Sequence, residues 1–529
     1  MTQAGENFVS GIGELLQGAA AQVLEQRLVT WLPRQRWFGA KSRTIKGVEI
    51  ADAAELPGLN AALVFLQLTY DDDSTGIYQV PLAISASDEA ISPASIVTEV
   101  ATASGLAVVH DALMREDVRQ AILNLIATNG EIPSRRGILR GRRSSAFDAV
   151  RGEEPLPART GSAEQSNSSI LYGSKLIMKL FRRMQPGENP DTEIGRFLTQ
   201  TARFPRIAAF LGDISLVLGD GEPTTLAMLQ GLVANDGDGW EWTLAELSHA
   251  YERAASLRLP RNFSPVNEEL SSEAGEFVGD SLAAAALLGQ RTAEMHLALA
   301  TPTENPAFQA EPFTGEDLAA DAARIETQLT LSLAALERGM SRLEDSAAVD
   351  AAVVLSRREI LFSRARALPA ASASGFGQRI RIHGDYHLGQ VLRSRGDYVI
   401  LDFEGEPART LAARRAKQSP LKDVAGMLRS YSYAAYAGLN ASPHAKDLEP
   451  WAALWRDSVS AEFLRSYRAT VEAADPRLLA QPAEAQTLLD AYLLEKALYE
   501  LLYELNNRPA WVRIPLSGIL ALLESKSGS

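Results

Sequence analysis

The chain has 529 residues, 46% of them hydrophobic and 22% charged, and this composition excludes a disordered, collagen-like or coiled-coil protein. Lys and Arg number 52 against 66 Asp and Glu, and the net charge of −14 argues against binding to nucleic acid or to an anionic membrane, since both need a cationic surface. The sequence holds no cysteine, which excludes disulfides, thiolate metal sites and a cysteine nucleophile. Without a signal-peptide pattern or an apolar run long enough to cross a bilayer, we expect a cytoplasmic protein.

The first 232 residues alternate between β-rich runs, turns and short helices. Apolar periodicity predicts helices over 21–31, 115–127 and 190–201. Alternating or β-branched runs predict strands over 45–50, 61–70, 77–84, 168–172, 175–181, 214–218 and 224–229. Residues 135–161 are rich in Arg, Gly, Pro and Ser without a period, which predicts a flexible surface loop. We divide this region into a cap unit at 1–95 and a second unit at 96–232.

Beyond residue 240 the sequence becomes rich in Ala, Leu and Glu. Helical periodicity predicts helices over 244–257, 279–299, 319–336, 347–367, 421–437, 450–473 and 483–505. One β-rich island, residues 379–405, interrupts them. The region 233–529 is therefore predicted to be one large, mainly helical unit with an embedded β segment, which makes the chain an α+β protein.

The β-rich island carries the densest group of chemically useful side chains. The island consists of an apolar segment, a polar loop and a second apolar segment. This order predicts a hairpin-like unit with Asp385, Gln390 and Asp402 close together at its open end. Phosphoryl transfer needs a carboxylate that accepts the proton of the attacking hydroxyl, and hard oxygen ligands for Mg²⁺. We assign the first role to Asp385 and the second to Gln390 and Asp402. Each aspartate alone would be an ordinary turn residue, but the complete set favours catalysis.

A kinase also needs a cation beside the nucleotide phosphates. Lys179 lies in the middle of a predicted strand, where a charge is costly unless it is paired, and Glu193 on the following helix is a candidate partner. Upstream, residues 161–169 stand where a phosphate-covering loop belongs, and Ser166, Asn167 and Ser168 are its candidate contacts. Taken alone, the lysine would be an edge residue and the loop a surface turn. The sequence contains no G-x-x-x-x-G-K-[ST] motif, so a P-loop NTPase is not supported.

Several strings, in order along the chain, resemble the bacterial maltokinase family. They are R-Q-R-W-F-G-A-K from Arg34, E-Q-S-N-S-S from Glu164, L-I-M-K-L-F-R-R from Leu176, N-P-D-T-E-I-G-R-F-L from Asn189, H-G-D-Y-H-L-G-Q-V-L from His383, L-D-F-E-G-E-P from Leu401, S-P-L-K-D-V-A-G-M-L-R-S-Y from Ser419 and Y-E-L-L-Y-E-L-N-N-R-P-A-W from Tyr499. The resemblance implies a bilobal fold similar to protein kinases and aminoglycoside phosphotransferases, with an N-terminal cap and a large helical C-lobe. It implies transfer of the ATP γ-phosphate to the anomeric hydroxyl of maltose, which gives maltose 1-phosphate for α-glucan synthesis. ATP and Mg²⁺ would be the cofactors, and a trehalose synthase would be a candidate partner.

Carried onto this sequence, the resemblance implies the same catalytic roles for Asp385, Gln390, Asp402, Lys179 and Glu193. It adds a hinge at residues 228–231, where the backbone of Met228 and Gln230 would meet adenine. For the sugar, four residues share one face of a helix and combine aromatic rings with charged groups: Lys496, Tyr499, Glu500 and Tyr503. Their structural alternative is a surface pair of Lys496 with Glu500 beside half-buried tyrosines. His383 and His387 would shape the sugar pocket, orient Asp385 or serve the core.

Other functions remain open at this stage. A related sugar or amino-sugar kinase, such as a glucosamine kinase, would have the same catalytic residues, because these residues do not determine which sugar is phosphorylated. A non-catalytic regulatory module on the same scaffold would usually have lost Lys179, Asp385 or Asp402, and this chain keeps all three. The chain is also longer than expected for maltokinases, with extra residues expected in 130–165, 264–276 and 300–375.

Overall fold

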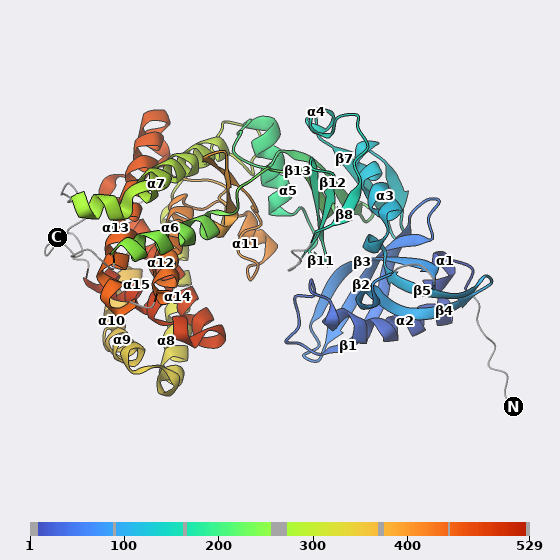
Figure 1. Cartoon of the computed structure of the whole chain (residues 1–529), viewed down its shortest axis with the longest axis horizontal. Helices are drawn as coiled ribbons and strands as arrows, with labels where there is room; N and C mark the ends of the chain where they lie inside the picture. Colours follow the sequence, from blue (N-terminus) through green and yellow to red (C-terminus); the bar gives the residue numbers. More distant parts are fainter. Residues whose placement is uncertain are drawn as a thin grey trace. The chain divides into compact units, whose positions relative to one another are not determined.

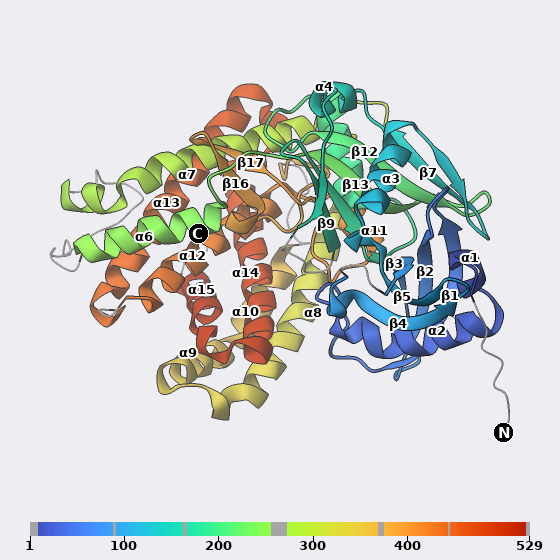
Figure 2. The ribbon, with the colours of Figure 1, turned by 45° about the vertical axis from the view of Figure 1, so that its right-hand side comes forward.

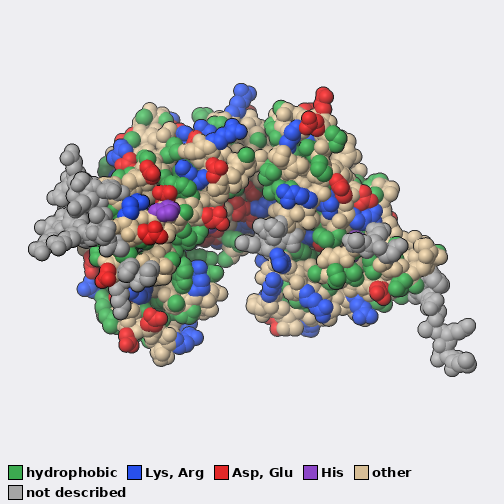
Figure 3. Space-filling view, viewed as in Figure 1, with side chains coloured by type: hydrophobic (Ala, Val, Ile, Leu, Met, Phe, Trp, Pro, Cys, Tyr) green, Lys and Arg blue, Asp and Glu red, His purple; other side chains and the backbone are tan. Residues whose placement is uncertain are grey.

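The computed structural model describes residues 9–87, 91–161, 167–254, 272–368, 375–442 and 445–524. The chain divides into two compact units (Figures 1 and 2). The first unit comprises Met1–Gln200 and Ala208–Val233, and the second comprises Thr201–Ile207 and Ala234–Ser529. Within the described part of the chain, no helix is both long enough and apolar enough to span a bilayer. On the face seen in Figure 3, acidic and basic side chains are interspersed over each unit.

The first unit opens with short helix α1, Ile12–Leu15, and helix α2, Gly18–Trp31. Helix α2 buries Ala21, Leu24, Leu28 and Trp31, whose spacing of three and four residues places them on one face. This face packs on an antiparallel sheet with the order β1-β2-β3-β5-β4, and β11 also pairs with β3. Its strands are β1 Ile45–Glu55, β2 Ala61–Tyr70, β3 Thr75–Ala86, β4 Ile96–Thr102, β5 Gly105–Asp111 and β11 Arg183–Met184.

A second antiparallel sheet, with the order β6-β7-β12-β13-β10-β9-β8, completes the first unit. Its strands are β6 Glu131–Pro133, β7 Ile138–Arg143, β8 Ala158–Thr160, β9 Asn167–Tyr172, β10 Leu176–Phe181, β12 Phe210–Val217 and β13 Thr224–Gly231. Three helices belong to it: α3 Glu116–Ala127, α4 Phe147–Arg151 and α5 Pro190–Arg196. Side chains alternate along β2, so that Leu63 and Phe65 join the core under α3 while Val64 and Leu66 join the core under α2.

The stretch 135–161, within which the sequence predicts a surface loop, also forms regular secondary structure. Strand β7, helix α4 and strand β8 occupy it. Gly141 is required here, because a Cβ at this position would lie 2.1 Å from the carbonyl oxygen of Leu125 on α3. The stretch has no sequence period because each of its elements is only three to six residues long.

The second unit is mainly helical. Its helices are α6 Gly239–Ala254, α7 Ser272–Leu299, α8 Gly315–Gly339, α9 Asp345–Ser356, α10 Arg358–Ala367, α11 Leu411–Arg415, α12 Leu421–Asn440, α13 Ala445–Ala474, α14 Pro482–Asn507 and α15 Arg513–Glu524. The predicted helix over 347–367 is broken at Arg357, and α15 was not predicted. A core shared by α8, α9, α10, α14 and α15 holds this side of the unit together.

The β-rich island forms the short strands β15 Gln378–Arg379, β16 Val391–Ser394 and β17 Asp397–Ile400, and β15 pairs with β14 Glu311–Pro312. Strands β16 and β17 pair as the predicted hairpin. The turn residues Arg395 and Gly396 have φ values of 52° and 78°, as a two-residue type I′ turn requires.

Candidate active site

The β16–β17 hairpin brings Gln390 and Asp402 together, because one residue precedes its first strand and the other follows its second. The amide nitrogen of Gln390 donates to Oδ2 of Asp402 over 2.9 Å, and the backbone of Leu401 bonds to that of Gln390. Asp402 has a φ of 67°, a left-handed conformation that Asp tolerates better than most residues. The two predicted metal ligands therefore form a fixed pair of oxygen-bearing side chains.

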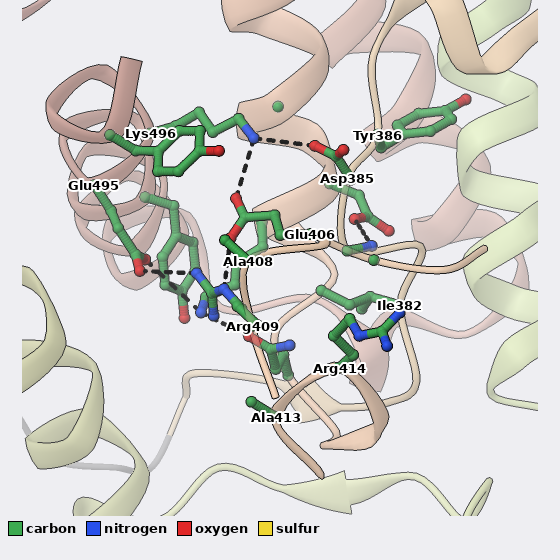
Figure 4. A pocket seen from close by; sticks show the side chains of 18 of the residues that line it. Ile382, Asp385, Tyr386, Glu406, Ala408, Arg409, Ala413, Arg414, Glu495 and Lys496 are labelled. Carbon is green, nitrogen blue, oxygen red and sulfur yellow. Dashed lines mark hydrogen bonds and ion pairs between the residues drawn. The ribbon is translucent and has the colours of Figure 1, made fainter. Parts of the chain in front are cut away.

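Asp385 lies in the loop that leads into this hairpin and lines a cavity of about 490 Å³ (Figure 4). Its Oδ1 contacts Nζ of Lys496 on α14 at 3.2 Å, and the same ammonium contacts Oε1 of Glu406 at 3.1 Å. Burial disfavours the charge on Lys496, but Asp385 and Glu406 outweigh it and raise the pKa of this ammonium above its ordinary value. Lys496 is thus a permanent cation between two carboxylates at the mouth of the candidate active site.

Glu495, which also lines the cavity, contacts three cationic side chains. Its carboxylate contacts Nε of Arg324 at 2.5 Å, Nη2 of Arg409 at 3.3 Å and Nζ of Lys422 at 3.7 Å. Burial opposes ionisation of Glu495, but the charges of Lys422, Arg324 and Arg409 prevail and lower its pKa to about 2. This side of the cavity is therefore a network of ion pairs, which sequence reasoning did not identify because its members come from four distant segments.

Asp423 on α12 anchors the loop that carries Asp385. Its two carboxylate oxygens accept the backbone N–H groups of His383 and Gly384, at 2.8 and 2.9 Å, and Oδ2 also contacts Nε2 of His296 at 3.1 Å. Burial would raise the pKa of this 1% exposed carboxyl, but hydrogen bonding from His296 leads the opposing effects and lowers it. Asp423 belongs to the string S-P-L-K-D that resembles the family, which was the only sequence signal for it.

Asp423→Asn should loosen this loop, because an amide offers one acceptor oxygen where two backbone donors and His296 now converge. Leaving one buried donor without a partner costs about 1–3 kcal/mol, so we expect a lower urea midpoint of unfolding. A displacement of about 1 Å at Asp385 would lower kcat by about 10²-fold. Asp397→Asn, which weakens the ion pairs with Arg206 and Arg291, serves as control. Equal effects on kcat in both variants would contradict the anchoring role.

The two loop histidines face the interior more than the cavity. His383 is 1% exposed, its Nε2 lies 2.8 Å from the carbonyl oxygen of Leu401, and its ring packs between Tyr386 and Phe403. This position argues against His383 as a sugar-binding residue of the pocket, and it favours the alternative that the ring supports Asp385. Burial is the main reason why the pKa of His387 is lowered.

The predicted sugar-binding stripe on α14 lies on the correct helix face but is displaced by one turn. Lys496 and Tyr499 line the cavity, together with Tyr492 and Glu495 of the preceding turn. Glu500 does not line it, because its carboxylate forms a buried ion pair with Arg429 of α12 at 2.5 Å. Tyr503 is 46% exposed and lies under the guanidinium of Arg508. The structure therefore does not bring Glu500 and Tyr503 into this cavity, where Lys496 and Tyr499 lie.

In the first unit, Lys179 lies on β10 beside β13 and is 22% exposed. Its Nζ contacts Oδ2 of Asp191 at 3.2 Å, an acidic partner on α5 that sequence reasoning did not select. Glu193, the predicted partner, is buried on the same helix. Asn189 caps α5 by accepting the N–H of Asp191, so the start of this helix fixes the carboxylate that faces Lys179.

The structure agrees with some of the other predicted nucleotide contacts and not with others. Ser166 lies outside the described residues, and Asn167 begins β9. The hydroxyl of Ser168 is fully buried and accepts from Arg182, so this side chain is not a phosphate contact, contrary to the prediction. Met228 and Gln230 lie inside β13, between β10 and β12, where the sheet uses their backbone groups. The chain leaves this sheet after Gly231, and the backbone contact of Met228 and Gln230 to adenine stays a prediction.

Comparisons with known proteins agree with this geometry. Residues 31–114 match the model of the maltokinase N-terminal cap domain. The chain is 26% identical to the glucosamine kinase of Streptacidiphilus jiangxiensis over 390 residues, which is 72% of this chain and 77% of the relative. It is 25% identical over 383 residues to the glucosamine kinase of Mycolicibacterium smegmatis, covering 72% and 82%.

Among solved structures, a glucosamine kinase in complex with glucosamine, ADP and inorganic phosphate has a TM-score of 0.62 at 21% identity, and covers 90% of this chain and 94% of that one. A crystal form of glucosamine kinase gives a TM-score of 0.63, also at 21% identity, with 90% and 92% covered. These likenesses confirm the predicted kinase-like α+β fold with an N-terminal cap and a large helical C-terminal region. They also support a phosphotransferase function.

Proposed function

We propose that this chain, a maltokinase-like kinase by its cap domain and its fold, transfers the γ-phosphate of ATP to a hydroxyl of a neutral sugar, with maltose as the preferred acceptor and maltose 1-phosphate as the product. One observation carries the proposal. Asp385 faces a cavity large enough for a small sugar, and Lys496 holds one of its two carboxylate oxygens. A trehalose synthase partner stays a prediction.

In the proposed reaction, the acceptor hydroxyl donates a hydrogen bond to Oδ2 of Asp385, while Lys496 retains Oδ1. The hydroxyl oxygen attacks the γ-phosphorus, the bond to the β-phosphate oxygen breaks, and ADP leaves. The hydroxyl proton passes to the Asp385 carboxylate. Lys496 keeps this carboxylate oriented through its contact with Oδ1.

The Gln390 and Asp402 pair fits Mg²⁺, since an amide and a carboxylate supply the oxygen ligands that this ion takes, and the hydrogen bond from the amide nitrogen of Gln390 to Oδ2 of Asp402 keeps the two side chains together. When bound, the ion would neutralise charge on the nucleotide phosphates. We assign Lys179, supported by Asp191 and Glu193, to the nucleotide phosphates as well. Each of these roles is part of the proposal.

The charge pattern of the cavity supports a neutral acceptor. All four carboxylates among its lining residues already have partners: Asp385 and Glu406 with Lys496, Glu495 with three cations, and Asp423 with the loop backbone and His296. An ammonium group on an amino sugar would meet carboxylates whose charge is already balanced, and it would lie beside cations such as Lys496 whose like charge opposes it. Hydroxyl groups can bond to the outer atoms of the same pairs without breaking them.

Glucosamine is the second candidate acceptor, because the two relatives from Streptacidiphilus jiangxiensis and Mycolicibacterium smegmatis are named glucosamine kinases. The two acceptors separate in an assay of ADP release with maltose, glucose, glucosamine and trehalose offered one at a time. We expect the highest kcat/KM with maltose. A preference for glucosamine would contradict the assignment of a neutral acceptor but not the assignment of kinase activity. Absence of ADP release with every sugar would contradict the proposed sugar kinase activity itself.

The displaced stripe on α14 gives a prediction about acceptor binding. Tyr499→Ala removes an aromatic wall of the cavity and should raise the KM for the sugar by about 2- to 10-fold, since a stacked ring contributes about 0.5–1.5 kcal/mol. The KM for ATP should stay the same. Tyr503→Ala is the matched control one turn farther along, and it should leave both constants near their original values. A larger rise of the sugar KM in Tyr503→Ala than in Tyr499→Ala would support the sugar contact of Tyr503 that the sequence predicts.

A further inference from the structure

Two ion pairs join a short turn of the second unit to α14 (Figure 4). At one end of the turn, Oε1 of Glu406 contacts Nζ of Lys496 at 3.1 Å. At the other end, Nη2 of Arg409 contacts Oε1 of Glu495, the residue before Lys496, at 3.3 Å. Glu406 and Arg409 also pair with each other, Oε2 with Nε, at 2.5 Å. Together with the contact of Lys496 to Asp385, these pairs place five side chains of alternating charge in one row along the cavity.

The turn packs directly on the loop that carries Asp385. The backbone N–H of Arg409 donates to the carbonyl oxygen of Glu406 over 3.0 Å, which places the two side chains beside each other. Gly405, which precedes the turn, has a φ of 70°, and a Cβ on Gly384 would lie 3.2 Å from its Cα. Gly384 is the neighbour of Asp385 in the sequence. Because the two backbones approach this closely, a shift of the turn would be transmitted to Asp385.

Glu406 determines how the ammonium of Lys496 meets Asp385. Nζ contacts both carboxylates, at 3.2 Å from Oδ1 of Asp385 and at 3.1 Å from Oε1 of Glu406. Without the attraction of Glu406, Nζ would move toward both oxygens of Asp385, and Oδ2 would no longer be left for the acceptor hydroxyl. Arg409 balances the charge of Glu406 at its second oxygen, and this contact keeps Glu406 in the position where it shares Lys496.

We infer that Arg409 is a positioning residue of the proposed reaction, which acts on Asp385 through Glu406 and Lys496. The inference rests on the proposed function, because it takes Asp385 as the acceptor of the sugar proton. Arg409 is itself fixed to α14 by Glu495, which has two further cationic partners. Loss of Arg409 would release one of the two attachments of the turn, and the pair of Glu406 with Lys496 could then pivot about the other.

The test uses Arg409→Gln, Arg409→Lys, Glu406→Gln and the double variant with both glutamine substitutions, all in the full chain. Glutamine removes the charge of Arg409, whereas lysine keeps it but cannot reach both carboxylates as the guanidinium fork does. Arg379→Gln is the matched control, because Arg379 also pairs with two carboxylates of this unit and has the same side-chain exposure of 29%. It is not among the described residues that line the cavity. The measurements are kcat, the KM values for sugar and ATP, and the urea midpoint of unfolding.

We expect Arg409→Gln to lower kcat by about 3- to 30-fold, while both KM values stay near those of the original chain. Arg409→Lys should recover part of this loss, and Arg379→Gln should keep the original kcat even if its urea midpoint falls. The double variant should lose no more kcat than Glu406→Gln alone, because both residues act on Asp385 through one series of contacts.

An unchanged kcat in Arg409→Gln would overturn the inference. Equal losses of kcat in Arg409→Gln and Arg379→Gln would show a merely structural role and refute it too. A higher sugar KM at an unchanged kcat would mean that Arg409 contacts the sugar itself, and losses that multiply in the double variant would mean that the two residues act independently; either result contradicts the inference. If the original chain released no ADP with any sugar, the proposed function would fail first, and the inference with it.

Discussion

Asp385→Asn should abolish nearly all turnover while nucleotide binding persists. The amide cannot accept the proton of the sugar hydroxyl, and loss of a general base lowers kcat by about 10²- to 10⁴-fold. The substitution preserves the size of the side chain, and Lys496 retains Glu406 as its partner. Single-turnover phosphate transfer and AMP-PNP titration measure the two quantities separately.

The matched control for this variant is Asp475→Asn, in the same unit, where the carboxylate pairs with an exposed arginine after α13. It should keep the original kcat. If Asp385→Asn also retained a near-normal rate, the assigned base would be wrong. If AMP-PNP binding collapsed together with kcat, Asp385 would be part of the nucleotide site rather than the acceptor site.

Asp402→Asn should remove most of the magnesium dependence of nucleotide binding and lower kcat by about 10²- to 10³-fold, the scale of losing one electrostatic stabiliser. Asparagine is chosen because it tolerates the left-handed backbone at this position as well as aspartate does, so the variant tests charge rather than strain. The measurement is the ATP dissociation constant as a function of the Mg²⁺ concentration.

Asp73→Asn provides the control for that variant, since Asp73 also has a positive φ, of 60°, but lies in an exposed turn of the first unit. It should leave the magnesium titration unchanged. An unaltered titration in Asp402→Asn would remove this residue from the proposed metal site. Loss of thermal stability in Asp402→Asn with an unaltered magnesium titration would mean that the carboxylate serves the fold and not the metal.

Local pattern predicted most helices and strands, because burial of one face imposes a period on the sequence. The four buried residues of α2 and the hairpin β16–β17 follow directly from such patterns. The pattern failed where elements are very short, as at β7, α4 and β8, because three to six residues cannot show a period.

The sequence by itself determined the kinase-like fold and the pairing of Gln390 with Asp402, because these two residues flank one hairpin, and Asp385 lies in the loop that leads into it. The tertiary structure decided which partner each remaining side chain takes. Glu500 and Glu495 are five residues apart on α14, yet packing against α12 commits the first to Arg429 while the second enters the cavity. Helical spacing fixes the face on which a residue lies, but only the neighbouring helices determine which turn of that face meets the ligand.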